Sequence, residues 1–269
     1  MRPEPALDLD AYLARVGYSG EPRPAAPGLE SLHLAHATHV PFENLDILLG
    51  KPIRLDLDSL QAKLVRGGRG GYCFEQNTLF AAALARVGFR VAPLAARVRQ
   101  GPPGPRPRTH MVLRVEADGG PWLADVGFGG DGPLLPVRLA PGEVSRQFHW
   151  TYRVAREADG AWVLQQRQAG AWQDLYAFTL EPQYPVDFEV ANHFTSTHPS
   201  SRFVQTLTAQ LPTPEARYVL RGRELTILRA AVSESRTIVD DDELLHILAD
   251  PFGLHFLPGT RFRSPVAAQ

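Results

Sequence analysis

The chain contains a single cysteine, Cys73, and its surroundings favour nucleophilic chemistry. Four glycines stand just before it, at positions 67, 68, 70 and 71, and an apolar pattern of helical period begins directly after it. Glycines let other groups approach the backbone closely, and the free N–H groups of a helix N-terminus favour the thiolate, the nucleophilic form of a thiol. We therefore predict that Cys73 is a nucleophile at the start of a helix. The alternative is that Cys73 is packed in the core as a small apolar side chain and takes no part in chemistry.

A cysteine nucleophile needs a base, and the base needs a group that orients it. His110 opens a predicted strand at 109–116, and Asp125 lies in an otherwise apolar predicted strand at 122–126. The residues between, 117–120, carry a hairpin turn signal, so His110 and Asp125 should become neighbours across the ladder. A carboxylate in an apolar strand is costly unless it is paired. The alternatives are an exposed strand-end histidine and a carboxylate satisfied by backbone N–H groups.

The other histidines predict no metal centre. His33, His36 and His39 recur every three residues on one predicted helix, but no cysteine or carboxylate ligands accompany them. We expect them to be surface or groove residues.

Two further patterns favour ligand binding more weakly. The glycine-rich run 127–132 resembles an anion nest, but it lacks the Gly-Lys-Ser/Thr ending of a nucleotide-binding loop, and a plain glycine turn is the alternative. Phe42 and Phe128 stand in turn contexts, which suits the wall of an apolar pocket, although core packing explains them nearly as well.

The elements that position these residues change in character along the chain. The first part has four helical patterns. Two lie at 7–17 and 28–39, a third is capped by Asp58 or Ser59 and ends at Val65, and the fourth runs from Cys73 to near Gly88. Strand patterns follow at 91–98, 109–116, 122–126, 148–156, 161–168 and 172–178, separated at 100–108 by a loop without helix or strand pattern. Mixed patterns come last: helices at 188–195 and 240–249 and strands at 218–220 and 225–230. We predict an α+β protein with boundaries at 1–88, 89–183 and 184–269, whose middle part is a small barrel or a sandwich.

The composition restricts which partners and which cellular compartment we expect. In 269 residues, 28 Lys and Arg balance 29 Asp and Glu, so nothing indicates capture of nucleic acid or of an anionic membrane. One cysteine excludes an internal disulfide and suits a reducing cytosol. The sequence shows neither a signal-peptide pattern nor an apolar run long enough for a membrane span. We expect a soluble cytoplasmic protein, and the oligomeric state stays open.

Five blocks of sequence resemble one family. They are Val-Pro-Phe-Glu-Asn-Leu at 40–45, Arg-Gly-Gly-Tyr-Cys-Phe-Glu at 69–75, Arg-Thr-His-Met at 108–111, Asp-Val-Gly-Phe-Gly at 125–129 and Asn-His-Phe-Thr-Ser-Thr-His-Pro-Ser-Ser at 192–201. In these blocks the chain resembles the arylamine N-acetyltransferases, especially the bacterial ones. The chain departs from the family pattern in two places. Gln76 stands where leucine is common in the family, and the carboxyl-terminal third is the part least similar to it. These departures leave the identity of the acceptor amine open.

The resemblance implies three lobes, a helical bundle, a β-barrel and an α/β lid, with a papain-like cysteine triad. It implies acetyl transfer from acetyl-coenzyme A, a co-substrate and not a bound cofactor, to an arylamine, arylhydrazine or arylhydroxylamine, a reaction of xenobiotic metabolism. By position, Cys73 becomes the nucleophile, His110 the base and Asp125 the orienting acid, and Arg69 and Glu75 are expected to pair. The acceptor pocket is expected to include Phe42, Thr109, Phe128 and Phe203, and the coenzyme A region Gly127, Gly129, Ser196 and Thr197.

Three other functions stay open at this point. An amide synthase of the same family would transfer a longer acyl chain with the same triad. A papain-like or transglutaminase-like peptidase would use the same residues for hydrolysis. A binding module would only pack the cysteine.

Overall fold

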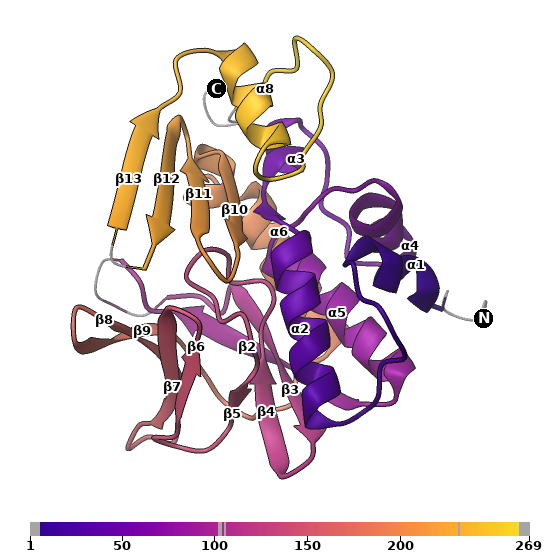
Figure 1. Cartoon of the computed structure of the whole chain (residues 1–269), viewed down its shortest axis with the longest axis vertical. Coiled ribbons are helices and arrows are strands. Elements are labelled where there is room, and N and C mark those ends of the chain that lie inside the picture. The colour runs from indigo at the N-terminus through magenta and orange to yellow at the C-terminus, as the bar shows by residue number, and fades with distance from the viewer. Residues whose placement is uncertain (1–5, 102–103, 105, 231, 264–269) are drawn as a thin grey trace.

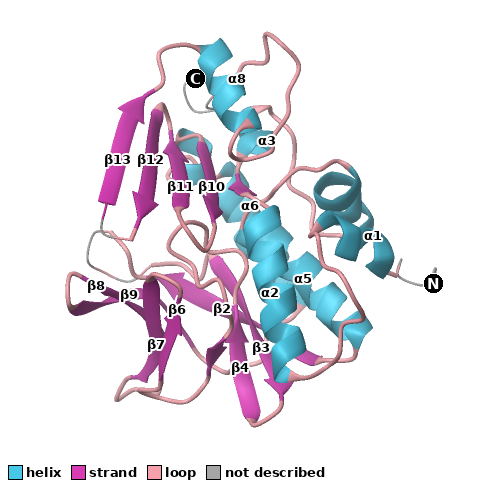
Figure 2. Ribbon diagram, viewed as in Figure 1, coloured by secondary structure: helices cyan, strands magenta, loops and turns pink. Residues whose placement is uncertain are grey.

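The computed structural model of the chain describes residues 6–101, 104, 106–230 and 232–263 (Figure 1). The fold is a mixed α/β arrangement of helices and two antiparallel sheets, one of eight strands and one of five (Figure 2). Within the described residues, no helix has both the length and the apolar character needed to cross a membrane.

Helices dominate the first ninety residues, as predicted. The helix that begins at Cys73 ends where Gly88 adopts a left-handed conformation with φ +107°. The predicted cap of the third helix was wrong by two residues, because the side chain of Asp56, and not of Asp58, accepts the Ser59 N–H. That helix then continues as a π-helix. The elements are α1 (Leu9–Arg15), α2 (Ala26–His39), β1 (Phe42–Glu43), α3 (Leu45–Leu48), α4 (Leu57–Leu60), the π-helix η1 (Gln61–Arg66) and α5 (Cys73–Val87).

The middle of the chain forms the eight-stranded sheet, which curls into a nearly closed barrel. Its strand order is β5-β4-β3-β2-β9-β8-β7-β6, and a bridge between Pro141 and Val154 brings the segment after β5 against β7. The six predicted strands are confirmed, whereas the short β5 and β6 were not predicted. The strands are β2 (Arg90–Val98), β3 (His110–Ala117), β4 (Gly120–Ala124), β5 (Val137–Arg138), β6 (Val144–Gln147), β7 (Trp150–Arg156), β8 (Trp162–Gln168) and β9 (Ala171–Phe178).

The predicted loop at 100–108 has no helix or strand where it is described, and residues 102, 103 and 105 lie outside the described residues. The hairpin that follows has the predicted form. Strand β3 pairs with β4 in a register that sets Leu113 opposite Ala124. Since the two strands are antiparallel, the start of β3 and the residue after β4 meet at the same end of the hairpin. His110 and Asp125 occupy these two positions.

The last part of the chain forms the five-stranded sheet and three helices. The two-residue strand β1 joins this sheet beside β10, so the sheet is anchored to the helical part. Helix α6 packs on the same helices, with the ring centroids of Phe74 and Phe188 6.2 Å apart. The domain boundaries given above stay a prediction. The elements are α6 (Pro185–Thr197), α7 (Arg202–Gln205), β10 (Thr208–Pro212), β11 (Arg217–Arg221), β12 (Glu224–Arg229), β13 (Val232–Thr237) and α8 (Asp241–Ala249).

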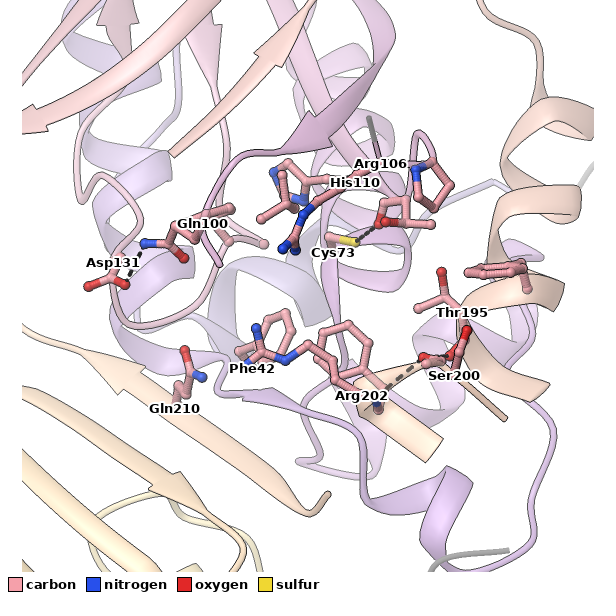
Figure 3. A pocket seen from close by; sticks show the side chains of 18 of the residues that line it. Phe42, Cys73, Gln100, Arg106, His110, Asp131, Thr195, Ser200, Arg202 and Gln210 are labelled. Carbon is pink, nitrogen blue, oxygen red and sulfur yellow. Dashed lines mark hydrogen bonds between the residues drawn. The ribbon is translucent and has the colours of Figure 1, made fainter. Parts of the chain in front are cut away.

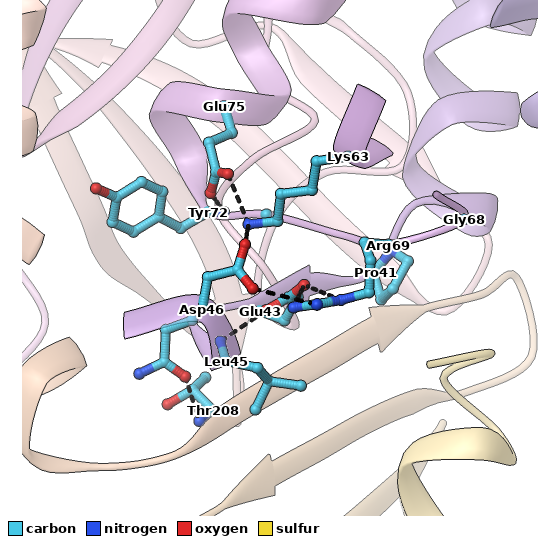
Figure 4. A network of polar contacts seen from close by, with 12 residues as sticks. Pro41, Glu43, Leu45, Asp46, Lys63, Gly68, Arg69, Tyr72, Glu75 and Thr208 are labelled. Atoms are coloured by element: carbon cyan, nitrogen blue, oxygen red, sulfur yellow. Dashed lines mark hydrogen bonds and ion pairs between the residues drawn. The ribbon is translucent and has the colours of Figure 1, made fainter. Parts of the chain in front are cut away.

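A network of five charged side chains fixes the segments on either side of the cysteine turn (Figure 4). Lys63 contacts Asp46 at 3.0 Å and Glu75 at 2.7 Å, and Arg69 contacts Glu43 at 2.6 Å and Asp46 at 3.2 Å. The expected pairing of Arg69 with Glu75 is therefore wrong, because each cation takes a different carboxylate and Asp46 lies between them.

Three carboxylates face two cations in this network, so one negative charge has no matching positive charge. Burial raises the pKa of Glu75 to about 7, despite the nearby charge of Lys63. Glu75 also accepts the Tyr72 N–H at 3.0 Å, which ties the network to the residue that precedes Cys73.

Lys63→Met should destabilise the protein by about 3 kcal/mol, because it leaves two largely buried carboxylates without their shared cation. Arg99→Met is the matched control, since Arg99 also contacts two carboxylates but at a solvent-exposed position, where the loss should stay below about 1 kcal/mol. Urea unfolding of both variants measures the difference, and equal losses would contradict the role given to the network.

Candidate active site

Cys73 is the first residue of α5 and is buried at the bottom of a cavity. Two glycines make room for this turn. A Cβ on Gly70 would lie 1.9 Å from the Pro41 carbonyl oxygen, and one on Gly127 would lie 2.7 Å from the Cys73 Cα. The Cys73 Sγ lies 3.6 Å from the Thr109 carbonyl oxygen. Gly127 therefore lets the helix start approach the open end of the β3–β4 hairpin, and Gly70 lets the preceding turn approach the segment before β1.

His110 and Asp125 form the predicted pair at the end of the hairpin. The His110 Nε2 lies 2.7 Å from the Asp125 Oδ2, and both side chains are buried. Cys73 and His110 line the same cavity, and the interaction with the Cys73 side chain is among the causes that raise the pKa of His110. The structure thus places the three residues proposed from the sequence at one site, where His110 and Asp125 are hydrogen-bonded to each other and Cys73 lines the same cavity as His110.

Asp125 is held by three groups besides His110. Its Oδ1 accepts hydrogen bonds from the Asn77 side chain at 3.0 Å and from the Gly127 N–H at 2.9 Å. Its backbone N–H donates to the His33 Nε2 at 3.1 Å. A buried carboxylate is tolerated when its oxygens are satisfied in this way, so the orientation of Asp125 is fixed before any ligand binds.

The charges of this pair support each other. Burial alone lowers the pKa of His110, but the negative charge of Asp125 and hydrogen bonds to Asp125 and Cys73 raise it to about 10. Burial raises the pKa of Asp125, but the charge of His110 and the hydrogen bonds from His110, Asn77 and Gly127 hold it below its ordinary value. At neutral pH the pair is therefore an imidazolium beside a carboxylate.

The cavity above Cys73 has a volume of about 300 Å³, and its walls combine aromatic side chains with polar and charged ones (Figure 3). The ring centroids of Phe42 and Phe203 are 5.7 Å apart on one wall, and those of Phe128 and His110 are 5.1 Å apart on another. Of the predicted substrate and coenzyme A residues, those that line the cavity are Phe42, Thr109, Gly127, Phe128 and Phe203.

The other three predicted coenzyme A residues do not line this cavity. A Cβ on Gly129 would lie 2.3 Å from the Gln210 side-chain oxygen. The glycine therefore allows the loop after β4 to pack closely against Gln210 of β10. The hydroxyls of Ser196 and Thr197 donate to backbone carbonyl oxygens within α6, at 2.8 and 2.6 Å. Contact of these residues with coenzyme A stays a prediction.

The expectation that the three helix α2 histidines lie at the surface or in a groove was wrong for two of them. His33 and His36 are fully buried, and His39 alone is exposed. The His33 Nδ1 lies 2.9 Å from the Leu134 carbonyl oxygen, which only accepts, so Nδ1 carries the proton and Nε2 is free to accept from Asp125. Burial lowers the pKa of His33 to about 4, which keeps this ring neutral.

Three residues that hold the pair were not found from the sequence. Asn77 stands four residues after Cys73 on the same face of α5, and that spacing was a usable signal. His33 comes from α2, and Tyr176 comes from β9 with its ring centroid 4.8 Å from that of His110. Neither residue has a local pattern that connects it to the hairpin. In the described part of the chain, no group of three His, Cys, Asp or Glu side chains is arranged to hold a metal ion.

Known proteins are similar to this chain in both sequence and fold. A family model described as N-acetyltransferase matches residues 27–258. The arylamine N-acetyltransferase of Mycobacterium tuberculosis is 43% identical over 256 residues, which cover 93% of this chain and 90% of that protein. The solved structure of an arylamine N-acetyltransferase from M. smegmatis has a TM-score of 0.90 to this chain at 40% identity. The match covers 98% of both chains. A structure of the Mycobacterium marinum enzyme in complex with CoA has a TM-score of 0.87 at 40% identity and covers 92% of this chain and 93% of that one.

The fold and the matched family model define an acetyltransferase. Within that class, the chain belongs to the arylamine N-acetyltransferase family.

The raised pKa of His110 predicts how stability depends on pH. The pair contributes its full stabilisation below the ordinary histidine pKa of about 6.5, and this contribution is lost as pH rises toward about 10, where folded His110 loses its proton. The difference in unfolding free energy between the unmodified protein and His110→Gln should therefore shrink by at least about 1 kcal/mol over this interval. Denaturant unfolding at several pH values measures it, with His39→Gln as the control at an exposed histidine. A difference that does not change with pH would argue against a protonated His110.

Proposed function

We propose that this protein transfers the acetyl group of acetyl-coenzyme A to the nitrogen of an arylamine, arylhydrazine or arylhydroxylamine through an acetyl-Cys73 intermediate. The observation that supports it most is the buried His110–Asp125 pair beside Cys73, at a cavity that several phenylalanines help to line, in a chain of this family. These three residues are the parts of a papain-like triad: a thiol, an imidazole that lines the same cavity, and a carboxylate that orients the imidazole.

In the first half-reaction the Cys73 thiolate attacks the carbonyl carbon of the thioester. The bond from that carbon to the coenzyme A sulfur then breaks, and the imidazolium of His110 gives its proton to the departing sulfur. Asp125 stabilises the imidazolium and keeps the ring in place. As a residue of the first helical turn, Cys73 has a backbone N–H without a partner inside the helix, and this group is placed to stabilise the developing oxyanion.

In the second half-reaction an aromatic amine enters the same cavity after coenzyme A has left. An arylamine is mostly uncharged at neutral pH, so it is both nucleophilic and suited to walls made by Phe42, Phe128 and Phe203. Its nitrogen attacks the acetyl carbon and loses a proton to His110. The bond to sulfur breaks, and the thiolate–imidazolium pair is restored. Two chemical steps that share one site give ping-pong kinetics.

We also propose that the reaction takes place in the cytoplasm and serves the metabolism of foreign amines. The single cysteine of the chain supports the compartment, because it suits a reducing environment.

Cys73→Ala should retain the fold and lose both acetylation and amine-dependent release of coenzyme A. Intact mass spectrometry after incubation with acetyl-coenzyme A should show one added acetyl group on the unmodified protein, removed when an arylamine is added, and none on the variant. Thioesters of longer acyl chains in the same assay test the amide-synthase alternative. A Cys73→Ala variant that still releases coenzyme A in the presence of an amine would remove Cys73 from the chemistry.

A further inference from the structure

A second cavity shares α5 and β3 with the catalytic cavity, and the mechanism above gives it no part. Its volume is about 480 Å³, compared with about 300 Å³ for the cavity that Cys73 lines. The residues that line it come from the segment leading into α4, from α5, from β2 and β3, and from the start of α6. Segments that lie far apart in the sequence therefore enclose a space large enough for a small organic molecule.

The two cavities lie on opposite sides of α5 and β3. Successive side chains of a strand point to opposite faces, and on β3 His110 lines the catalytic cavity while Met111 lines the second one. On α5, Cys73 lines the catalytic cavity and Thr78 lines the second. The Thr78 hydroxyl lies 3.6 Å from the Met111 sulfur, so the helix and the strand meet in the wall of the second cavity.

The inner wall of the second cavity is apolar. Met111 and Phe188 are only 3% and 4% exposed. Leu55, Leu57 and Ala81 also line the cavity and are partly buried against the same hydrophobic core. A ligand that covers these side chains removes apolar surface from water, which favours binding. The inner wall therefore suits the apolar part of a ligand.

The exposed residues that line the second cavity carry negative charge. They include Asp56, Asp58 and Glu189, and none of the described lining residues is a lysine, an arginine or a histidine. The hydrogen bond from the Ser59 N–H and the charge of Arg54 lower the pKa of Asp56, so this carboxylate already has partners. The ion pairs among the described residues include neither Asp58 nor Glu189. These two carboxylates are therefore available to a positively charged ligand.

We propose that the second cavity binds an organic cation in which an ammonium group is joined to an apolar body. Asp58 and Glu189 accept charge-assisted hydrogen bonds from the ammonium group, and Met111 and Phe188 contact the apolar body. An anion of the same shape meets like charges, and an uncharged molecule gains only the apolar contacts. The site uses none of the residues of acetyl transfer, so the proposal goes beyond the proposed function and does not rest on it.

The second cavity is close to the groups that hold the catalytic residues. The Met111 carbonyl oxygen accepts from the Asn77 side chain at 2.8 Å, and the same Asn77 nitrogen donates to Asp125 at 3.0 Å. Met111 also follows His110 directly in the chain. A ligand in the catalytic cavity can therefore affect Met111 through these contacts, and a test has to separate binding in the two cavities.

Met111 is a direct reporter of binding, because the chain has only two methionines and the other is its first residue. Protein labelled with 13C-methyl methionine is titrated with 4-phenylbutylamine, a cation at neutral pH, and with 4-phenylbutan-1-ol, an uncharged molecule of nearly the same shape. Both titrations are repeated after iodoacetamide has alkylated Cys73, the only cysteine, which blocks the catalytic cavity.

Two double variants are titrated in the same way. Asp58→Asn with Glu189→Gln removes the two carboxylates of the proposed site. Asp242→Asn with Glu143→Gln is the matched control, since it removes the same charge at two exposed positions outside the lining of the cavity.

The amine should shift the Met111 methyl signal before and after alkylation and should bind roughly 5-fold or more tightly than the alcohol, since charge-assisted hydrogen bonds at a partly exposed site contribute on that order. The site variant should lose this difference and still bind the alcohol, and the control variant should keep it. Equal affinities for amine and alcohol, a difference that survives in the site variant, or no shift with either ligand would overturn the proposal. A shift that disappears on alkylation would place the amine in the catalytic cavity and would overturn it as well. None of these measurements depends on acetyl transfer, so their failure leaves the proposed function untouched.

Discussion

A buried carboxylate, Asp125, is the constraint on which the rest of the site depends. A charged group in an apolar interior is expensive unless its partners stabilise it, and here they come from three different elements: His110 from β3, Asn77 from α5 and His33 from α2. Because these partners must converge on one carboxylate, the helices and the barrel have to pack in one relative position. The same requirement fixes the imidazole in the cavity that Cys73 also lines.

The rest of the architecture serves this convergence. Helix α5 presents Cys73 and Asn77 on one face, one turn apart, so a single helix supplies both the sulfur and a group that holds the carboxylate. Glycines at 70 and 127 let that helix start lie against neighbouring backbone. The charged network around Lys63 then fixes the segment before the cysteine, because its member Glu75 accepts the Tyr72 N–H.

How much of this follows from sequence depends on how local each contact is. His110 and Asp125 are 15 residues apart in one hairpin with a recognisable turn, so counting along two strands was sufficient to pair them. The role of His33 could not be predicted in this way. Its contact with Asp125 joins residues 92 positions apart, and its burial depends on the whole helical part. The two-residue strand β1 was missed for the same reason, since it exists only by pairing with β10. The resemblance to a family supplied the roles of residues, whereas the groups that hold them required coordinates.

The most direct test of the account is the protonation state of His110, measured from the nitrogen chemical shifts of its imidazole ring in protein labelled with 15N-histidine, with His110→Gln used for assignment. The account predicts that both ring nitrogens carry a proton at neutral pH and that the ring loses one only near pH 10, because Asp125 raises the pKa of His110 to about 10. A neutral ring at pH 7 that titrates near the ordinary value of about 6.5 would contradict it.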